Sequence, residues 1–338
     1  MLKKALKWIS VLFVTASLFV LAGVYLLWQD MQAALVKPLP LTKVTLFDVP
    51  SGTNVRQLSN TLMANGWIQE ALFFEIEVRR QKLAQQLKAG TYELAPGDTP
   101  ISIIEKISRG DTANFSVRFI EGMSYPQVRQ VLSQASNLKR TLAGVDETAL
   151  LAMFPTEHES LEGMFFPSTY FYSTQSSDLD ILKRAYETMQ SVLDEQWQKR
   201  QPGLPYESPY EALIMASIIE KETGQAAERK QIAGVFVRRL KKGMKLQTDP
   251  TVIYGLGEAF DGNLRRKDLR ADTPYNTYTR YGLPPTPIAM PGEASIEAAL
   301  NPADGKALYF VAKGNGWHAF SATLKEHNAA VRKYQLKK

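Results

Sequence analysis

The stretch "PYEALIMASIIEKETG", residues 209–224, predicts a helix with a carboxylate on its apolar face. Alanine, isoleucine, methionine and glutamate are acceptable or good helix formers, and Gly224 is a natural stop. The residues three, four and seven positions before Glu222 are all apolar: Ile219, Ile218 and Met215. The same positions before Glu220 form a more mixed face: Ser217, Ala216 and Leu213. A buried carboxylate either has a structural partner or keeps a raised pKa that serves catalysis, and both interpretations of Glu222 are open here.

The composition excludes several classes of chemistry and partner. The chain has 338 residues, enough for two domains and a membrane segment, and a net charge of +6. Basic residues are interleaved with acidic ones, so nucleic acid is not an expected partner. The absence of cysteine excludes disulfides and a thiolate nucleophile, and it fits an oxidising compartment.

The N-terminus has the pattern of a retained membrane anchor. Lysines stand at positions 3, 4 and 7, and no charged residue follows until after Gln29. At ~1.5 Å per residue, residues 8–28 span roughly 30 Å, the thickness of a bilayer core, so we expect them to contact membrane lipid. A cleaved signal peptide has a shorter apolar region, and a lipoprotein cysteine is absent after "LAG" at 21–23. The lysines predict a cytoplasmic N-terminus, with the rest of the chain outside.

Beyond this anchor at residues 1–29, the sequence predicts an α+β protein. Residues 30–43 contain two prolines and are expected to be a tether. Residues 44–110 form a small domain with strands at 44–50 and 89–94 and helices at 54–66, 70–80 and 100–110. Within it, "APGDTPISIIEKI" at 95–107 resembles the "GDT" opening of LysM modules, which bind N-acetylglucosamine sugars, although "GDT" is equally a good turn and helix cap.

Residues 111–338 are expected to form a larger catalytic domain with a cleft made by long loops. The predicted elements are a strand at 115–122, helices at 124–132, 178–199, 209–224, 228–243, 296–302 and 323–335, and a hairpin at 307–321. Five aromatic residues within 161–173 are more typical of a core than of a sugar site. The stretches 244–257 and 272–292 read as long loops rich in Pro, Gly, Thr, Tyr and Asn, a composition that suits an ordered carbohydrate cleft.

Carboxylates are the remaining candidates for chemistry. The histidines, His158, His318 and His327, have no metal-ligand spacing, and no GxSxG, P-loop or GxGxxG motif is present, so neither metal nor cofactor is expected. Glu220, Glu222 and Asp249 remain, and Asp249 could equally be the cap of a Pro-led turn. Glycoside cleavage normally uses two carboxylates. One suffices if the sugar's own C6 hydroxyl attacks C1 and leaves a 1,6-anhydro ring.

Five ordered blocks resemble the MltG-type (YceG-like) endolytic murein transglycosylases across nearly the whole chain. They are "LEGMFFPSTYFY", "ASIIEKET", "LQTDPTVIYG", "PYNTYTRYGLPP" and "IAMPG". The resemblance assigns the catalytic acid/base to Glu222, in agreement with the helical-face argument, and leaves Glu220 as a possible secondary residue. It also places in the cleft, as substrate-positioning residues, Gln247, Asp249, Tyr275, Asn276, Thr277 and Tyr278. Ser168 departs from the family's usual Pro–Asp–Thr–Tyr, which puts a carboxylate role there in doubt.

The resemblance implies an enzyme of the cytoplasmic (inner) membrane whose periplasmic domain cuts new glycan strands internally. The bond cut is the β-1,4 bond from MurNAc to GlcNAc, without water, which leaves 1,6-anhydro-MurNAc ends and limits strand length. Penicillin-binding protein synthases are the implied partners. Two alternatives stay open: a glycan-binding or synthase-scaffold protein without activity, and a hydrolytic muramidase with Asp249 as its second carboxylate.

Overall fold

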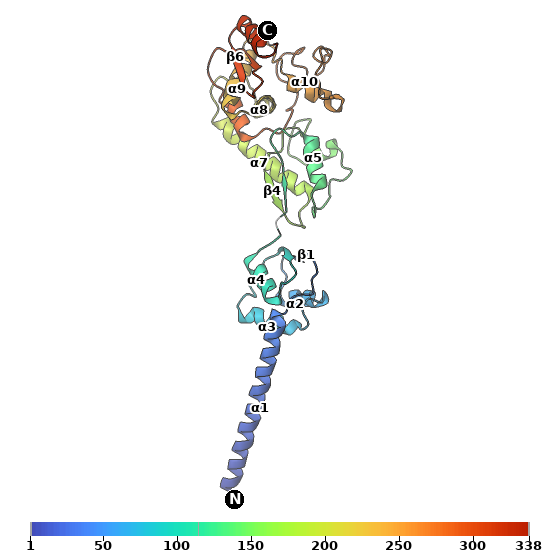
Figure 1. The fold of residues 1–338 in the computed structure, drawn as a ribbon, viewed down its shortest axis with the longest axis vertical. Coiled ribbons are helices and arrows are strands. Elements are labelled where there is room, and N and C mark those ends of the chain that lie inside the picture. The colour runs from blue at the N-terminus through green and yellow to red at the C-terminus, as the bar shows by residue number, and fades with distance from the viewer. Residues whose placement is uncertain (1, 114, 337–338) are drawn as a thin grey trace. The chain divides into compact units, whose positions relative to one another are not determined.

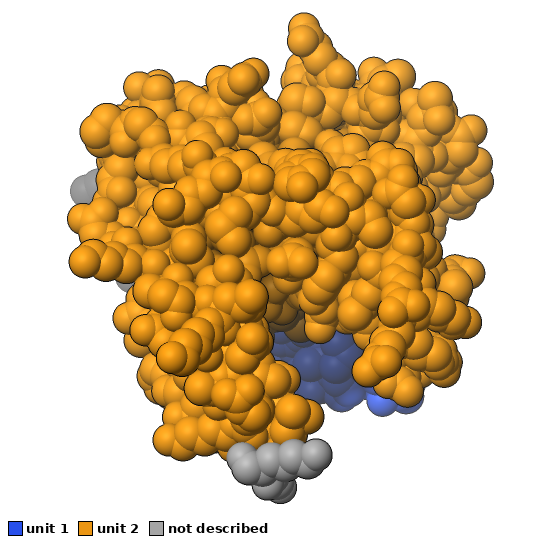
Figure 2. Space-filling view, turned by 90° about the horizontal axis from the view of Figure 1, so that it is seen from above, with its two compact units in different colours: residues 1–115, 173–175 blue, residues 116–172, 176–338 orange. Residues whose placement is uncertain are grey.

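A computed structural model describes residues 2–113 and 115–336, and the chain divides into two compact units (Figures 1 and 2). Unit 1 comprises residues 1–115 and 173–175, and unit 2 comprises residues 116–172 and 176–338. Both units contain helices and short strands, which agrees with the predicted mixture of α and β structure. The predicted domain boundary follows residue 110, and the two units divide after Phe115.

The first helix, α1 (Leu2–Val36), begins unit 1 (Figure 1). Its segment Leu12–Val36 is long and apolar enough to cross a membrane, with a mean hydropathy of 1.8. The expectation of an irregular tether from residue 30 is wrong for residues 30–36, which continue the helix. Met31 and Leu35 are buried there, and α1 packs on α3 and α4, so tertiary contacts extend the helix up to the prolines.

The remainder of unit 1 is built from two strands and three helices. In chain order these are β1 (Thr45–Val49), α2 (Val55–Ala64), α3 (Ala71–Arg80), β2 (Gly90–Leu94) and α4 (Pro100–Arg109). The strands pair antiparallel, with Thr45 opposite Leu94 and Val49 opposite Gly90. Each predicted element is present, because the apolar positions of the helices and strands face one core.

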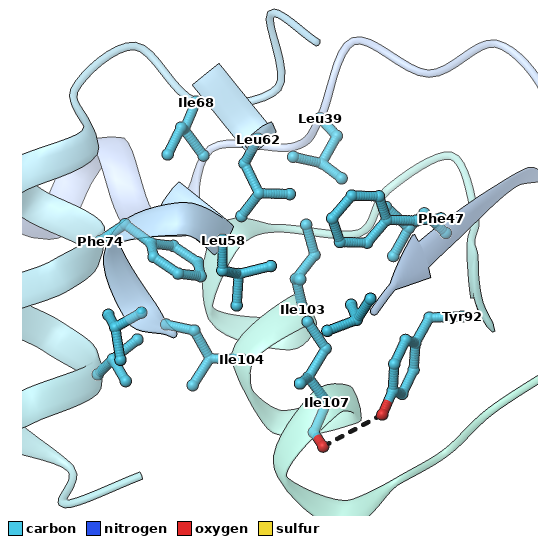
Figure 3. Packing of buried hydrophobic residues seen from close by; sticks show 14 residues of the cluster. Leu39, Phe47, Leu58, Leu62, Ile68, Phe74, Tyr92, Ile103, Ile104 and Ile107 are labelled. Atoms are coloured by element: carbon cyan, nitrogen blue, oxygen red, sulfur yellow. Dashed lines mark hydrogen bonds between the residues drawn. The ribbon is translucent and has the colours of Figure 1, made fainter. Parts of the chain in front are cut away.

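That core lies between the sheet and the helices (Figure 3). Leu58 and Leu62 of α2 meet Ile104 and Ile107 of α4, and all four side chains are at most 1% exposed. The Tyr92 hydroxyl reaches the Ile107 carbonyl at 3.4 Å, so the one polar atom among these aromatic and aliphatic groups is satisfied. Burial of this kind supplies most of the stability of a small domain.

The "GDT" motif forms a turn and a helix cap. The Asp98 carboxylate accepts a hydrogen bond from the Ala95 amide at 2.7 Å and pairs with the Lys106 ammonium at 2.5 Å. The Thr99 hydroxyl accepts the Ser102 amide and begins α4. The motif therefore has a complete structural role in starting α4.

The chain of unit 2 places one helix at its centre. Its elements are β3 (Phe115–Arg118), α5 (Tyr125–Gln134), α6 (Glu147–Leu151), β4 (Thr169–Tyr172), α7 (Asp178–Gln198), α8 (Pro209–Glu222), η1 (Ala226–Glu228), α9 (Arg229–Lys241), α10 (Asp249–Leu256), η2 (Gly257–Ala259), α11 (Glu293–Leu300), β5 (Tyr309–Ala312), β6 (His318–Ser321) and α12 (Leu324–Tyr334). Helix α8 packs on α7, α9, α10 and α11 (Figure 1). Because neighbours surround α8, its residues 212–219 are all buried.

Of three stretches for which the sequence made a prediction in unit 2, two agree with the structure and one does not. The aromatic stretch 161–173 does build core: Phe165 is fully buried, with its ring centre 6.0 Å from Tyr125 and 5.5 Å from Phe154. The expectation that residues 244–257 form a loop is wrong, because α10 begins at Asp249. Proline at the start of α10 fits the first helical turn, and Thr251 and Val252 are buried. Residues 272–292 do lack helix and strand, as predicted.

Replacing Ile104 by alanine should destabilise unit 1 by about 2–5 kcal/mol, because its side chain is fully buried and the change leaves a cavity. Ile76 is the matched control: it lies on α3, is 42% exposed, and its replacement by alanine should cost less than about 1 kcal/mol. Hydrogen exchange of the β2 amides measures this unit alone. Equal protection in the two variants would contradict the described core.

Candidate active site

Glu222 is the last residue of α8, at the point where the buried helix reaches a pocket. The three apolar neighbours named from the sequence, Met215, Ile218 and Ile219, are fully buried. After Glu222 the backbone turns to an extended conformation at Thr223, which ends the helix. The carboxylate therefore stands on an apolar base with one side open to the pocket.

The pocket has a volume of about 440 Å³ and is walled by the carboxyl-terminal half of unit 2. Helix α9 contributes Phe236 and Arg239, strand β5 contributes residues 309–312, and α12 contributes three side chains. The remaining lining residues are Leu246, Gln247, Asp249, Tyr278, His318 and Gln335. Its size suits one or two sugar rings, and its lining mixes aromatic faces with hydrogen-bonding groups.

The surroundings of Glu222 favour its protonated form. Burial raises the pKa of Glu222 to about 7, and the negative charge of Asp249 acts in the same direction. A hydrogen bond donated by the Thr248 hydroxyl and the positive charge of Arg239 oppose this, but they are weaker than the burial. A carboxyl group with a pKa near 7 can give up a proton and take one back at neutral pH.

The segment that carries Thr248 is held in an unusual backbone conformation. Gln247 has a φ of +49°, which is uncommon for a residue other than glycine. The Gln247 amide donates to the Thr277 carbonyl at 3.1 Å, and the Thr248 amide donates to the Thr277 hydroxyl at 3.0 Å. These bonds leave Thr248 buried toward Glu222, with Gln247 and Asp249 exposed on either side.

The predicted substrate-positioning residues fall into two groups. Gln247, Asp249 and Tyr278 line the pocket, and the Tyr278 hydroxyl donates to Asp249 at 2.5 Å. Thr277 and Asn276 are buried beneath them, and the Asn276 amide donates to the Ala271 carbonyl at 2.6 Å.

The hydroxyl groups of Tyr275 and Thr286 form a hydrogen bond of 2.8 Å. Thr277, Asn276 and Tyr275 therefore shape the loop behind the pocket and do not line it. This separates them from Gln247, Asp249 and Tyr278.

Glu220 lies on a different side of α8 and has a structural environment. Its carboxylate accepts the Gly292 amide at 3.0 Å and the Ser295 hydroxyl at 2.7 Å, and Arg229 lies 3.7 Å away. These contacts attach the start of α11 to α8. The sequence suggested a mixed face here, yet the neighbouring positions are as buried as those of Glu222, because helices surround α8.

Several residues of the site were not identified from the sequence. Arg239 lines the pocket and donates to the Leu246 carbonyl at 2.7 Å. His318 and His327 line the pocket, although their spacing in the sequence indicated no role for them. Thr248 lies between Gln247 and Asp249, which were both predicted as site residues. Its place between them is the one feature of the sequence that indicates it.

Glu162 is a further buried carboxyl that sequence reasoning passed over within the aromatic stretch. It is 1% exposed, accepts the Tyr125 amide at 3.0 Å and the Tyr254 hydroxyl at 3.1 Å, and burial raises its pKa to about 7. Tyr254 belongs to α10, so this contact ties the helix beginning at Asp249 to the core. Ser168, the position where the sequence departs from the resemblance, accepts the Phe119 amide through its backbone carbonyl at 2.9 Å.

Among the described residues, no group of three or more His, Cys, Asp and Glu side chains has a geometry suited to a metal ion. Within the pocket, Asp249 instead pairs with the Tyr278 hydroxyl, and Arg239 with backbone carbonyls.

Comparison with known proteins identifies related sequences and a related structure. A model of the YceG-like family matches residues 47–333. A Bacillus subtilis protein named endolytic murein transglycosylase is 36% identical over 305 residues, covering 85% of this chain and 84% of the relative. A Streptococcus pneumoniae protein of the same name is 28% identical, and the match spans 58% of its length.

A solved structure of a YceG-like protein from Listeria monocytogenes is also similar. It aligns with a TM-score of 0.55 at 33% identity, covering 86% of this chain and 99% of that one. The match to the family across both units, together with these relatives, shows that the chain belongs to the YceG-like family.

Proposed function

We propose that the protein is a membrane-anchored lytic transglycosylase that cleaves the β-1,4 bond between MurNAc and GlcNAc within peptidoglycan strands. The observation that carries the proposal is the Glu222 carboxyl, set at the end of a buried helix and open to a sugar-sized pocket, with a pKa of about 7. The names of the relatives support the same reaction class.

In the first step, protonated Glu222 donates its proton to the glycosidic oxygen and the bond from that oxygen to C1 breaks. The positive charge that develops on the sugar ring is next to a site made negative by Glu222 and Asp249. In the second step the C6 hydroxyl oxygen attacks C1, and its proton passes to a base in the pocket. The Glu222 carboxylate formed in the first step is available as that base, and the product has a 1,6-anhydro ring.

The other pocket residues suit substrate positioning. The exposed Gln247 amide can bond sugar hydroxyls or acetamido groups, and the Tyr278 ring offers a flat face beside Asp249. Asp249 is exposed at the pocket, and its negative charge helps to keep Glu222 protonated. The positive charge of Arg239 limits that effect.

The location proposed for this reaction follows from α1. With residues 8–28 in the lipid of the cytoplasmic membrane and the N-terminal lysines inside, the pocket lies on the periplasmic side, where glycan strands are made. Cutting there would limit strand length. Penicillin-binding protein synthases are the partners we propose at that surface.

Unit 1 offers a second glycan contact. A groove of about 410 Å³ is lined by the end of β1, the following turn and α2, from Phe47 to Thr61. We propose that this LysM-like region holds a strand while unit 2 cuts it.

Replacing Glu222 by glutamine should abolish cleavage, with a fall in kcat of at least about 100-fold, because the amide cannot donate the proton. The full-length protein in detergent would be incubated with uncrosslinked peptidoglycan, and the products read by mass spectrometry. Wild type should leave internal cuts with 1,6-anhydro ends. At pH 8 the variant should be at least as stable as wild type. The pKa of Glu222 is higher in the folded protein than in the unfolded chain, so wild type loses stability as the pH rises through about 7, and glutamine does not ionise.

Other products would select one of the alternatives. Reducing ends that contain an added water would identify a hydrolase and direct attention to Asp249. Binding without cleavage by wild type would identify a glycan-binding or scaffold protein.

The pH profile of kcat/KM should fall above about pH 7, because the free enzyme must be protonated at Glu222. Thr248→Val removes the bond that lowers this pKa, so the decline should move to higher pH. Asp249→Asn removes the charge that raises it, so the decline should move to lower pH with activity retained.

Thr188→Val is the matched control, since its hydroxyl donates to the Arg184 carbonyl within α7 and Thr188 lies outside the pocket lining. Its profile should equal that of wild type. Shifts in the same direction for Thr248→Val and Asp249→Asn would contradict this assignment. Loss of all cleavage in Asp249→Asn would instead favour two-carboxylate chemistry.

A further inference from the structure

A buried carboxylate and an imidazole form a pair at the edge of the Glu222 pocket. Glu228 is 4% exposed and accepts the His318 backbone amide at 2.9 Å. Its other oxygen lies 2.8 Å from His318 Nδ1. The edge of Phe310 meets the His318 ring, with 5.3 Å between ring centres, so the ring is fixed by packing as well as by the carboxylate.

The contact between Glu228 and Nδ1 determines which ring nitrogen of His318 is left to accept a proton. A carboxylate only accepts hydrogen bonds, so Nδ1 carries the hydrogen that points at Glu228. In the neutral ring, Nε2 then has a free lone pair. A carboxylate behind the ring also stabilises the imidazolium that forms when Nε2 takes a proton, which is the arrangement used by general bases in acyl transfer.

The chain places this pair beside Glu222. Glu228 ends the η1 turn that follows α8, and His318 begins β6 and lines the same pocket as Glu222. The turn of the hairpin approaches the segment after Glu222: a Cβ at Gly316 would lie 3.2 Å from the Gln225 side-chain nitrogen. One stretch, residues 222–228, thus holds both the carboxyl acid and the carboxylate that orients the imidazole.

We propose that His318 is the base that takes the C6 hydroxyl proton, with Glu228 as its positioning residue; this rests on the proposed lytic reaction. Glu222 gives its proton to the leaving oxygen, and the bond from that oxygen to C1 breaks. The C6 oxygen then bonds to C1 while its proton moves to His318 Nε2. Glu222 ends as carboxylate and His318 as imidazolium, and the proton returns to Glu222 through solvent. Guidance of the C6 oxygen by His318 also explains how the site favours that oxygen over water.

The test compares rates and product ends for the full-length protein and its His318 variants. His318→Ala should lower kcat about tenfold or more with little change in KM, and should lower the ratio of anhydro to reducing ends. Added imidazole should restore part of the anhydro-forming rate in His318→Ala, because the deletion leaves room for it. His318→Gln fills that space without a base, so it should show the same loss and no rescue. Glu228→Gln should lower kcat while the histidine stays in place.

His158→Ala is the matched control. His158 stacks on Tyr210, with 3.6 Å between ring centres, and lies outside the pocket lining. Its rate, product ends and response to imidazole should equal those of wild type. Circular dichroism melts verify folding, which His318→Ala should retain because the backbone bond to Glu228 does not need the ring.

The outcomes separate this inference from the proposed function. Anhydro ends from wild type, with unchanged kcat and product ratio in both His318→Ala and His318→Gln, would overturn the role of His318 alone. Reducing ends from wild type would overturn the lytic reaction and this role with it. A folded His318→Ala variant could also lose activity, keep the wild-type product ratio and show no rescue by imidazole. That result would mean that His318 only shapes the pocket, and it would overturn its role as a base.

Discussion

The site depends on one constraint: a carboxyl group is placed where a buried helix ends, with too few partners to compensate its charge. Helix α8 is surrounded by α7, α9, α10 and α11, and burial is the strongest influence on the Glu222 carboxyl at its end. Glu222 receives one hydrogen bond, from Thr248, and lies near the opposing charges of Asp249 and Arg239. Desolvation exceeds these effects, and the carboxyl stays available as an acid near neutral pH.

Glu220 shows that a place near the end of α8 does not by itself leave a carboxyl group without partners. It leaves the same helix two residues earlier, but two hydrogen-bond donors and Arg229 meet it, and it attaches α11 to α8. The polar contacts of Glu220 hold two helices together. Glu222 has fewer such contacts, and this leaves its carboxyl group able to act as an acid. Thr277 and Glu162 extend the scaffold by fixing the Thr248 backbone and helix α10.

Much of this arrangement could be predicted from local patterns. Periodic apolar residues, caps and glycine stops located most helices and strands, and the neighbours of Glu222 identified its face. The extension of α1 to Val36 and the formation of α10 were missed, because both depend on burial against distant segments. The pairing of Glu228 with His318 was missed for the same reason, since 90 residues separate the partners. Among the loop residues, sequence could not separate those that line the pocket from those that support it.

Direct titration of the Glu222 carboxyl tests the central claim most closely. Carbon-13 NMR of the protein labelled at glutamate side-chain carboxyls, with Glu222→Gln to assign the signal, gives its pKa without reference to any substrate. The account predicts a midpoint near 7. A midpoint near the ordinary value of 4.5 would show that Glu222 is well solvated or fully paired, and would contradict its role as the acid.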